Sequence, residues 1–227
     1  MSKNVVEKID DLVKINTVLV SVSDKTGLDK LIPAMVDTCP DILILSTGGT
    51  YTRIQEILGD KADGCLRQVS DYTGQPETQG GLVKTLDFKI YLGLLTETYN
   101  DSHQADLERA GARAIDMVIV NLYPFSQTIA KDGVTCEDAR GNIDIGGPTM
   151  IRASAKNFIR VASVVDPASY DTLIDALNKN KGGLGLKDRF ELAQKAFEHT
   201  AVYDRTISDF LAAQAFETVN SCYQTGE

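Results

Sequence analysis

The residues best suited to chemistry lie between Asn142 and Asn157. Asp144 precedes a Gly146-Gly147-Pro148 turn, and Lys156 lies at the far end of the helix that this turn would open. A helix N-terminus binds anions through backbone N–H groups without intrahelical partners and through the helix dipole. Asp144 and Lys156 could accept and donate protons. The residues alone favour Asp144 as a helix cap, and Lys156 could be a last-turn lysine that complements the dipole. The block indicates a site for a phosphorylated small molecule.

Further candidate groups follow predicted strands. They lie in the turns Ser23–Gly27, Thr47–Thr50 and Asn121–Phe125 and in the loop that holds Lys84 and Thr85. Glycine turns let backbone N–H groups approach a phosphate, and hydroxyl groups and lysines add donors and positive charge. Neither a Walker phosphate loop nor a dinucleotide-binding glycine fingerprint is present.

The order of predicted elements indicates an α/β fold. Apolar runs predict buried strands at 17–22, 41–46, 115–121 and 161–165, and helical spacing predicts helices at 4–16, 28–38, 50–58 and 187–216. A capping box at Thr135 and Asp138 predicts a short helix, and Asp166-Pro167 predicts another helix start. Residues 70–90 are interpreted as loop and 178–185 as a flexible connector. Strands that alternate with helices favour a parallel sheet, with ligand sites where its strands end. We expect one domain over residues 1–227.

Composition narrows the functional classes. The net charge of −9 over 227 residues argues against a nucleic-acid-binding surface. The four cysteines are scattered and the histidines number two, so neither a disulfide framework nor a metal site is expected. The first residues carry charges where a signal peptide would be apolar, and we expect a cytoplasmic protein that does not associate with membranes.

Read together, these motifs resemble one family. The matching stretches are Ser21–Gly27, Ser46–Thr50, Val69–Gly74, Val83–Leu86, Asn121–Phe125, Ile143–Gly147, Ala155–Asn157, Ala196–Ala201 and Tyr203–Asp209. Residues 17–214 are similar to the inosine monophosphate cyclohydrolase domain of the bifunctional purine-biosynthesis enzyme. The resemblance implies a methylglyoxal-synthase-like three-layer α/β sandwich with a mostly parallel central sheet and C-terminal helices.

The implied reaction closes the purine ring of 5-formamidoimidazole-4-carboxamide ribonucleotide (FAICAR) with loss of water, without metal or organic cofactor. By similarity, the catalytic residues are Lys84, Tyr123, Asp144 and Lys156, with Asp144 and Lys156 as a proton relay and Lys84 polarising the formyl oxygen. Substrate binding is assigned to Ser23, Lys25, Thr47, Gly48, Gly49, Thr50, Thr85, Asn121, Gly146 and Gly147. The resemblance also implies a homodimer. Because no transformylase domain is expected within 1–227, a separate transformylase would supply the substrate.

The chain departs from the family at Leu82, where the family has an arginine that contacts ligand. Asp87-Phe88 replaces a His-Pro pair, and Tyr91 stands where the family has a histidine. Leucine cannot replace a guanidinium group, so ligand affinity or choice could differ. Two alternatives therefore stay open: a purine-nucleotide-binding regulatory protein with reduced or no catalysis, and a lyase of the methylglyoxal synthase type. The block around Asp144 fits the lyase poorly.

Overall fold

The computed structural model describes residues 5–76, 84–224 and 226. Its centre is a five-stranded sheet with the strand order β4-β3-β2-β5-β6, in which every neighbouring pair is parallel. The strands are β2 (Thr17–Val22), β3 (Leu43–Ser46), β4 (Leu66–Gln68), β5 (Met117–Asn121) and β6 (Ala162–Val164). The four predicted strands are confirmed, and β4 was not anticipated.

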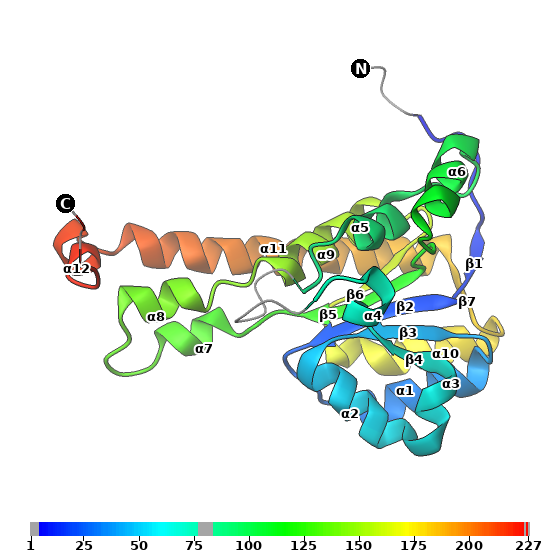
Figure 1. Cartoon of the computed structure of the whole chain (residues 1–227), viewed down its shortest axis with the longest axis horizontal. Helices are drawn as coiled ribbons and strands as arrows, with labels where there is room; N and C mark the ends of the chain where they lie inside the picture. Colours follow the sequence, from blue (N-terminus) through cyan, green and yellow to red (C-terminus); the bar gives the residue numbers. More distant parts are fainter. Residues whose placement is uncertain (1–4, 77–83, 225, 227) are drawn as a thin grey trace.

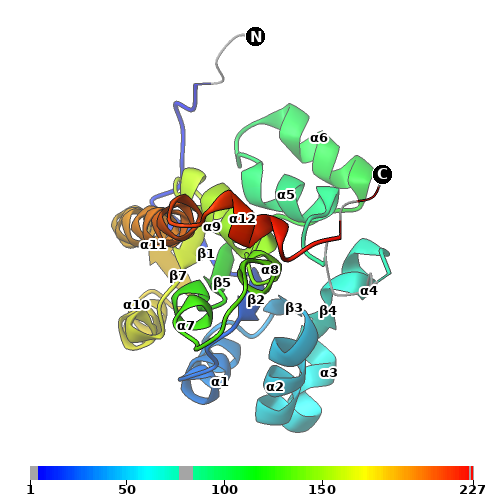
Figure 2. The ribbon, with the colours of Figure 1, turned by 90° about the vertical axis from the view of Figure 1, so that its left-hand side faces the viewer.

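The strands alternate their side chains between two cores. In β2, Val18 and Val20 face a core built with α1 (Leu28–Thr38), α2 (Gly48–Leu58) and α10 (Tyr170–Lys179). Leu19 faces the second core, with α5 (Phe88–Leu95), α9 (Gly146–Lys156) and α11 (Leu186–Ala212). This alternation follows from the two-residue period of a strand, and it places helices on both faces (Figure 2). The predicted three-layer α/β sandwich is confirmed.

The remaining helices are short connections or lie at the C-terminal end of the fold. They are α3 (Ala62–Cys65), α4 (Val69–Thr73), α6 (Asp101–Ala110), α7 (Phe125–Ile129), α8 (Cys136–Gly141) and α12 (Phe216–Asn220), with 3₁₀ turns at Gly59–Lys61 and Pro167–Ser169. The predicted capping box at Thr135 and Asp138 begins α8. The Asp166 carboxylate accepts the Ala168 N–H at the start of the 3₁₀ turn Pro167–Ser169. Figure 1 shows α7, α8, α12 and the C-terminal half of α11 extending beyond the sheet as one arm.

The predicted helix at 4–16 is wrong. Residues 5–11 have no helix, and β1 (Leu12–Lys14) pairs antiparallel with β7 (Gly183–Gly185), inside the segment interpreted as a flexible connector. The fully buried Arg189 holds both segments, because its guanidinium donates to the carbonyls of Asp10, Asp11 and Leu184. Hydrogen bonds across more than 170 residues thus override the local helical spacing.

The expectation of a loop over 70–90 holds only in part. Residues Val69–Thr73 form α4 and Phe88 begins α5. Leu82 and the Gly80-Gly81 pair lie outside the described residues.

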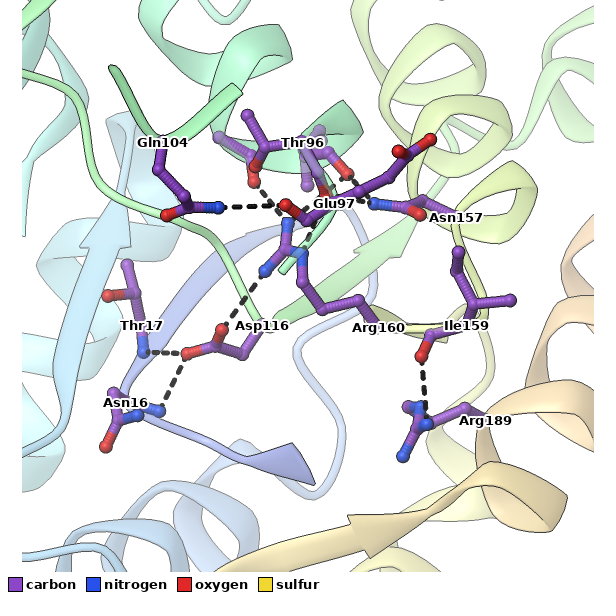
Figure 3. A network of polar contacts seen from close by, with 12 residues as sticks. Asn16, Thr17, Thr96, Glu97, Gln104, Asp116, Asn157, Ile159, Arg160 and Arg189 are labelled. Atoms are coloured by element: carbon purple, nitrogen blue, oxygen red, sulfur yellow. Dashed lines mark hydrogen bonds and ion pairs between the residues drawn. The ribbon is translucent and has the colours of Figure 1, made fainter. Parts of the chain in front are cut away.

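A buried polar network fixes the amino-terminal edge of the sheet, opposite the strand ends that carry the predicted site (Figure 3). Arg160, just before β6, donates to the Thr96 carbonyl and pairs with Asp116 at 3.2 Å. Asp116 in turn accepts the N–H groups of Asn16 and Thr17 at the start of β2. The network sets the relative position of β2, β5 and β6, and so of the loops that follow them.

No described helix is both long and apolar enough to cross a membrane. All four cysteines are free thiols.

Candidate functional site

The predicted turns meet at one edge of the sheet. Strand β2 is hydrogen-bonded to β3 and to β5 in parallel register, with Val20 opposite Ser46 and Val22 opposite Asn121. The turns after these three strands therefore leave the sheet side by side, as the sequence predicted.

The turn after β3 begins α2, and this helix N-terminus, together with Lys25 and Lys84, is the candidate anion seat. The Thr47 side chain makes no capping hydrogen bond within the described residues, so the first N–H groups of α2 stay available. The Lys84 Nζ lies 3.4 Å from the position that a Cβ on Gly48 would take, and the Lys25 Nζ lies 4.0 Å from the corresponding position on Gly49. Two ammonium groups and a helix N-terminus together favour a phosphate here.

Two side chains that were predicted to bind ligand instead make hydrogen bonds within the protein. The buried Thr50 hydroxyl donates to the Val22 carbonyl and accepts the Val22 N–H. The Asn121 Oδ1 accepts the N–H groups of Ser23 and Asp24, and its Nδ2 donates to the Asp24 carbonyl. Thr50 and Asn121 therefore shape the turn that carries Ser23 and Lys25.

Asp144 occupies the N-terminus of α9. Its Oδ1 accepts the Gly147 N–H at 2.9 Å, and its own N–H donates to the Tyr203 hydroxyl of α11 at 2.8 Å. Burial raises the pKa of Asp144, while the N–H groups of Gly147, Tyr123 and Gly146 lower it. Since the carboxylate already fills this helix end, the Gly146-Gly147 turn is a poorer anion seat than the sequence suggested, and a half-buried base stands there instead.

Glycine is required at 147 because the Asp144 carboxylate lies so near. A Cβ there would be 2.5 Å from the Asp144 Oδ2 and 2.6 Å from the Leu122 Cδ2. The same close approach occurs at Gly146, where a Cβ would be 2.8 Å from the Thr85 Oγ1. The Lys84–Thr85 segment thus joins the anion seat at α2 to the Asp144 carboxyl at α9.

Lys156 and Tyr123, the other predicted catalytic residues, lie in different places, and Asp87 has a structural contact. Lys156 is the last residue of α9, so about 16 Å of helix separates it from Asp144. The predicted proton relay would have to span the length of α9 or join two copies of the chain, and it stays a prediction. Tyr123 follows β5 with 62% of its surface exposed. Asp87 caps α5 by accepting the Lys89 N–H, which gives this departure from the family a structural role.

Four side chains around this edge were not among the predicted catalytic or substrate-binding residues. The Tyr203 hydroxyl of α11 accepts the Asp144 backbone N–H, and the half-buried Tyr91 of α5 lies near enough for the Asp144 carboxylate to raise its pKa. An open cavity of about 550 Å³ lies on the other side of the Ser23 turn, with Asp166 and His199 in its wall. His199 and Tyr203 lie in the helix predicted at 187–216, and Asp166 lies at a predicted helix start. Local spacing carried no signal for which loop each side chain would face.

The chain matches known families along most of its length. The MGS-like domain family matches residues 41–149, and the family described as AICARFT/IMPCHase bienzyme matches residues 154–226. The fold and these matches define an MGS-like α/β domain whose C-terminal part is similar to the AICARFT/IMPCHase bienzyme family.

Particular relatives agree with this class. The chain is 48% identical over 197 residues to the Bifunctional purine biosynthesis protein PurH of Prochlorococcus marinus (strain NATL2A), and the match covers 87% of this chain and 36% of the relative. For the protein of the same name from Ruminiclostridium cellulolyticum the identity is 46%, with 37% of the relative covered. The crystal structure of ForH superposes with a TM-score of 0.72 at 28% identity, over 86% of this chain and 98% of that one. The resemblance to the cyclohydrolase domain of the bifunctional enzyme is confirmed, although the chain spans little more than a third of the curated relatives.

Proposed function

We propose that this chain acts in purine biosynthesis as an inosine monophosphate cyclohydrolase. The observation that carries the proposal is the Lys84–Thr85 segment, which links a two-lysine anion seat to a half-buried carboxyl. A nucleotide has a phosphate at one end and a nucleobase at the other. With its phosphate at the two lysines, its reacting nucleobase can lie beside Asp144.

The reaction forms a bond between the carboxamide nitrogen and the formyl carbon of one substrate. The water that leaves takes the formyl oxygen, one carboxamide hydrogen and the formamide hydrogen. We assign the first proton to Asp144, whose raised pKa makes it a stronger base than an exposed aspartate. Lys84 would stabilise the negative charge on the formyl oxygen, and binding would hold the two groups in a reactive conformation.

A ring-closure assay tests the proposal. Purified protein is mixed with FAICAR, and the formation of inosine monophosphate is followed by ultraviolet absorbance. We expect turnover by the wild type and none above background by Lys84→Ala or Asp144→Ala. Wild-type protein that binds the substrate without closing the ring would favour the regulatory alternative, which Leu82 motivates. Consumption of triose phosphate would favour the lyase.

We further propose a homodimer. The arm carries exposed apolar side chains on α11 and α12, among them Leu211 and Phe216, which is 74% exposed. Exposed apolar area of this kind is typical of a protein interface. The position of Lys156 adds a second reason, because a catalytic Lys156 would have to reach the Asp144 of another copy.

Mixed dimers test this arrangement. Asp144→Ala and Lys156→Ala chains, each expected to be inactive alone, are mixed and re-equilibrated. If one copy supplies Lys156 to the other, about a quarter of wild-type activity returns in an equal mixture, since half of the dimers are mixed and each restores one of its two sites. No recovery in mixtures shown by mass to exchange subunits would contradict the trans role of Lys156.

The substrate partner follows from the same reaction. The chain would need FAICAR from a separate transformylase, and no metal or organic cofactor is assigned to any step. Adding a transformylase with its formyl donor and the unformylated ribonucleotide should give inosine monophosphate only when this chain is present.

A further inference from the structure

Tyr203 of α11 holds the backbone of the residue proposed as the base. Its hydroxyl oxygen accepts the Asp144 N–H at 2.8 Å, across 59 residues of sequence. Asp144 lies in the segment 142–145 between α8 and α9, outside any helix or strand. The two N–H groups before it donate to the Ala139 and Arg140 carbonyls in the last turn of α8. At Asp144 the Tyr203 hydroxyl takes the place of such a backbone acceptor.

Asp144 is therefore held at both ends. The Tyr203 hydroxyl fixes its backbone, and the Gly147 N–H, which donates to the carboxylate Oδ1 at 2.9 Å, fixes its side chain. If the backbone bond were lost, only the contact with Gly147 would remain, and the carboxylate could pivot about it. The two bonds together restrict the direction in which the carboxylate faces a substrate, and catalytic rates depend strongly on such orientation.

The ring of Tyr203 links this bond to the neighbouring turn of the site. It packs edge to face on the buried Phe125, with the ring centroids 6.3 Å apart. Phe125 begins α7 directly after Tyr123, and its N–H donates to the Tyr123 carbonyl at 2.8 Å. The Tyr123 N–H in turn interacts with the Asp144 carboxylate and lowers the pKa that burial raises. Helix α11, which packs against α9 and α7 (Figure 1), thus contacts both turns through one side chain.

We propose that Tyr203 is a positioning residue, whose hydroxyl oxygen holds the Asp144 backbone and so sets the direction from which the carboxylate meets the substrate. The inference deepens the proposed function and rests on it, because Asp144 is the base of that reaction. Tyr203 acts through Asp144 and touches no reacting atom in this account.

Amide hydrogen exchange tests this hydrogen bond without requiring activity. Tyr203→Phe keeps the ring against Phe125 and removes only the oxygen that accepts the Asp144 N–H. The Asp144 amide, followed by ¹⁵N-resolved NMR in D₂O, should exchange about tenfold faster in the variant, since a local hydrogen bond no longer protects it. Amides in the centre of β5 should keep their wild-type rates, which shows that the fold is intact. An unchanged Asp144 rate overturns the inference.

In an active enzyme, the split between kcat and KM separates positioning from stability. Loss of one hydrogen bond that orients the base predicts a fall in kcat of about tenfold in Tyr203→Phe. KM should stay within about twofold of wild type, because Lys25 and Lys84 of the anion seat lie on other segments and are left in place.

Tyr72→Phe is the matched control. The Tyr72 hydroxyl also accepts a backbone N–H from a distant segment, that of Arg113 at 2.7 Å, but Asp144 is not among the groups that act on Tyr72. The variant should speed exchange of the Arg113 amide and keep the wild-type kcat. Equal losses of kcat in Tyr72→Phe and Tyr203→Phe would leave Tyr203 with a structural role alone and overturn the inference.

A graded variant keeps the result decisive. A singly fluorinated tyrosine at position 203 has nearly the same shape and a weaker acceptor oxygen. Its kcat and its Asp144 exchange rate should both lie between those of wild type and Tyr203→Phe, and it serves if Tyr203→Phe does not fold.

The failure of this inference differs from failure of the proposed function. If the wild type does not close the ring, the cyclohydrolase proposal fails, while the exchange rates still decide whether Tyr203 holds Asp144. If the wild type is active and the kcat of Tyr203→Phe lies within about twofold of it, the cyclohydrolase proposal stands and this inference is overturned.

Discussion

Replacing Gly147 by alanine is the sharpest test of how the site is built. The new methyl carbon would lie 2.5 Å from the Asp144 Oδ2, where ordinary contact begins near 3.4 Å. The carboxylate must therefore move by about 0.9 Å, or the start of α9 must shift, and Leu122 blocks the other side at 2.6 Å. A misplacement of about 1 Å in a catalytic group can cost on the order of 100-fold in rate.

We expect Gly147→Ala to lower kcat about 100-fold in the ring-closure assay, with a smaller change in KM, since the anion seat at α2 is left intact. The free energy of unfolding should fall by about 1–3 kcal/mol from overpacking, less up to about 1 kcal/mol for the better helix former.

Gly141→Ala is the matched control. It is also a helical glycine with a negative φ, and a Cβ there meets no described atom within 4 Å. It should keep wild-type activity. If Gly147→Ala turns over within about threefold of wild type, the reaction does not depend on the position of the Asp144 carboxylate.

Three further predictions address binding, stability and pH. Lys25→Gln and Lys84→Gln should each weaken binding of the phosphorylated ligand about tenfold in calorimetry and flatten its salt dependence, whereas an equal loss for the unphosphorylated nucleoside would argue against a phosphate seat. Arg189→Met should lower the free energy of unfolding in urea by about 3–5 kcal/mol because five backbone carbonyls lose their donor, and a loss below about 1 kcal/mol would contradict that role. Asp144→Asn should be inactive yet more stable than wild type at neutral pH. Because burial raises the pKa of Asp144 in the folded wild type, the neutral carboxyl stabilises the fold below the ordinary pKa of 3.8, and this stabilisation is lost as the pH rises. The melting temperatures of Asp144→Asn and wild type should therefore be equal near pH 3 and differ increasingly at higher pH.

Much of the fold could be predicted because its signals are local. The apolar runs of β2, β3, β5 and β6 are typical of strands buried on both faces, and a parallel sheet needs helices between them. The capping box of α8 depends on two residues three apart. The failure at 4–16 has an equally plain cause, since β1 exists only through its pairing with β7, about 170 residues away.

The sequence by itself determined four strands of the central sheet, the helices α1, α2 and α11, and the glycine- and hydroxyl-rich turns that leave the sheet on one edge. Strand and helix periods and turn residues act over a few positions, so these features can be predicted locally. Tertiary structure alone decided which groups in those turns remain available. It committed Thr50 and Asn121 to hydrogen bonds with the β2 turn, and it placed Lys156 a helix length from Asp144. It also brought the Tyr203 hydroxyl, 59 residues along the chain, to the Asp144 backbone N–H. These outcomes depend on where separate segments meet, and that is set by packing across the whole sheet.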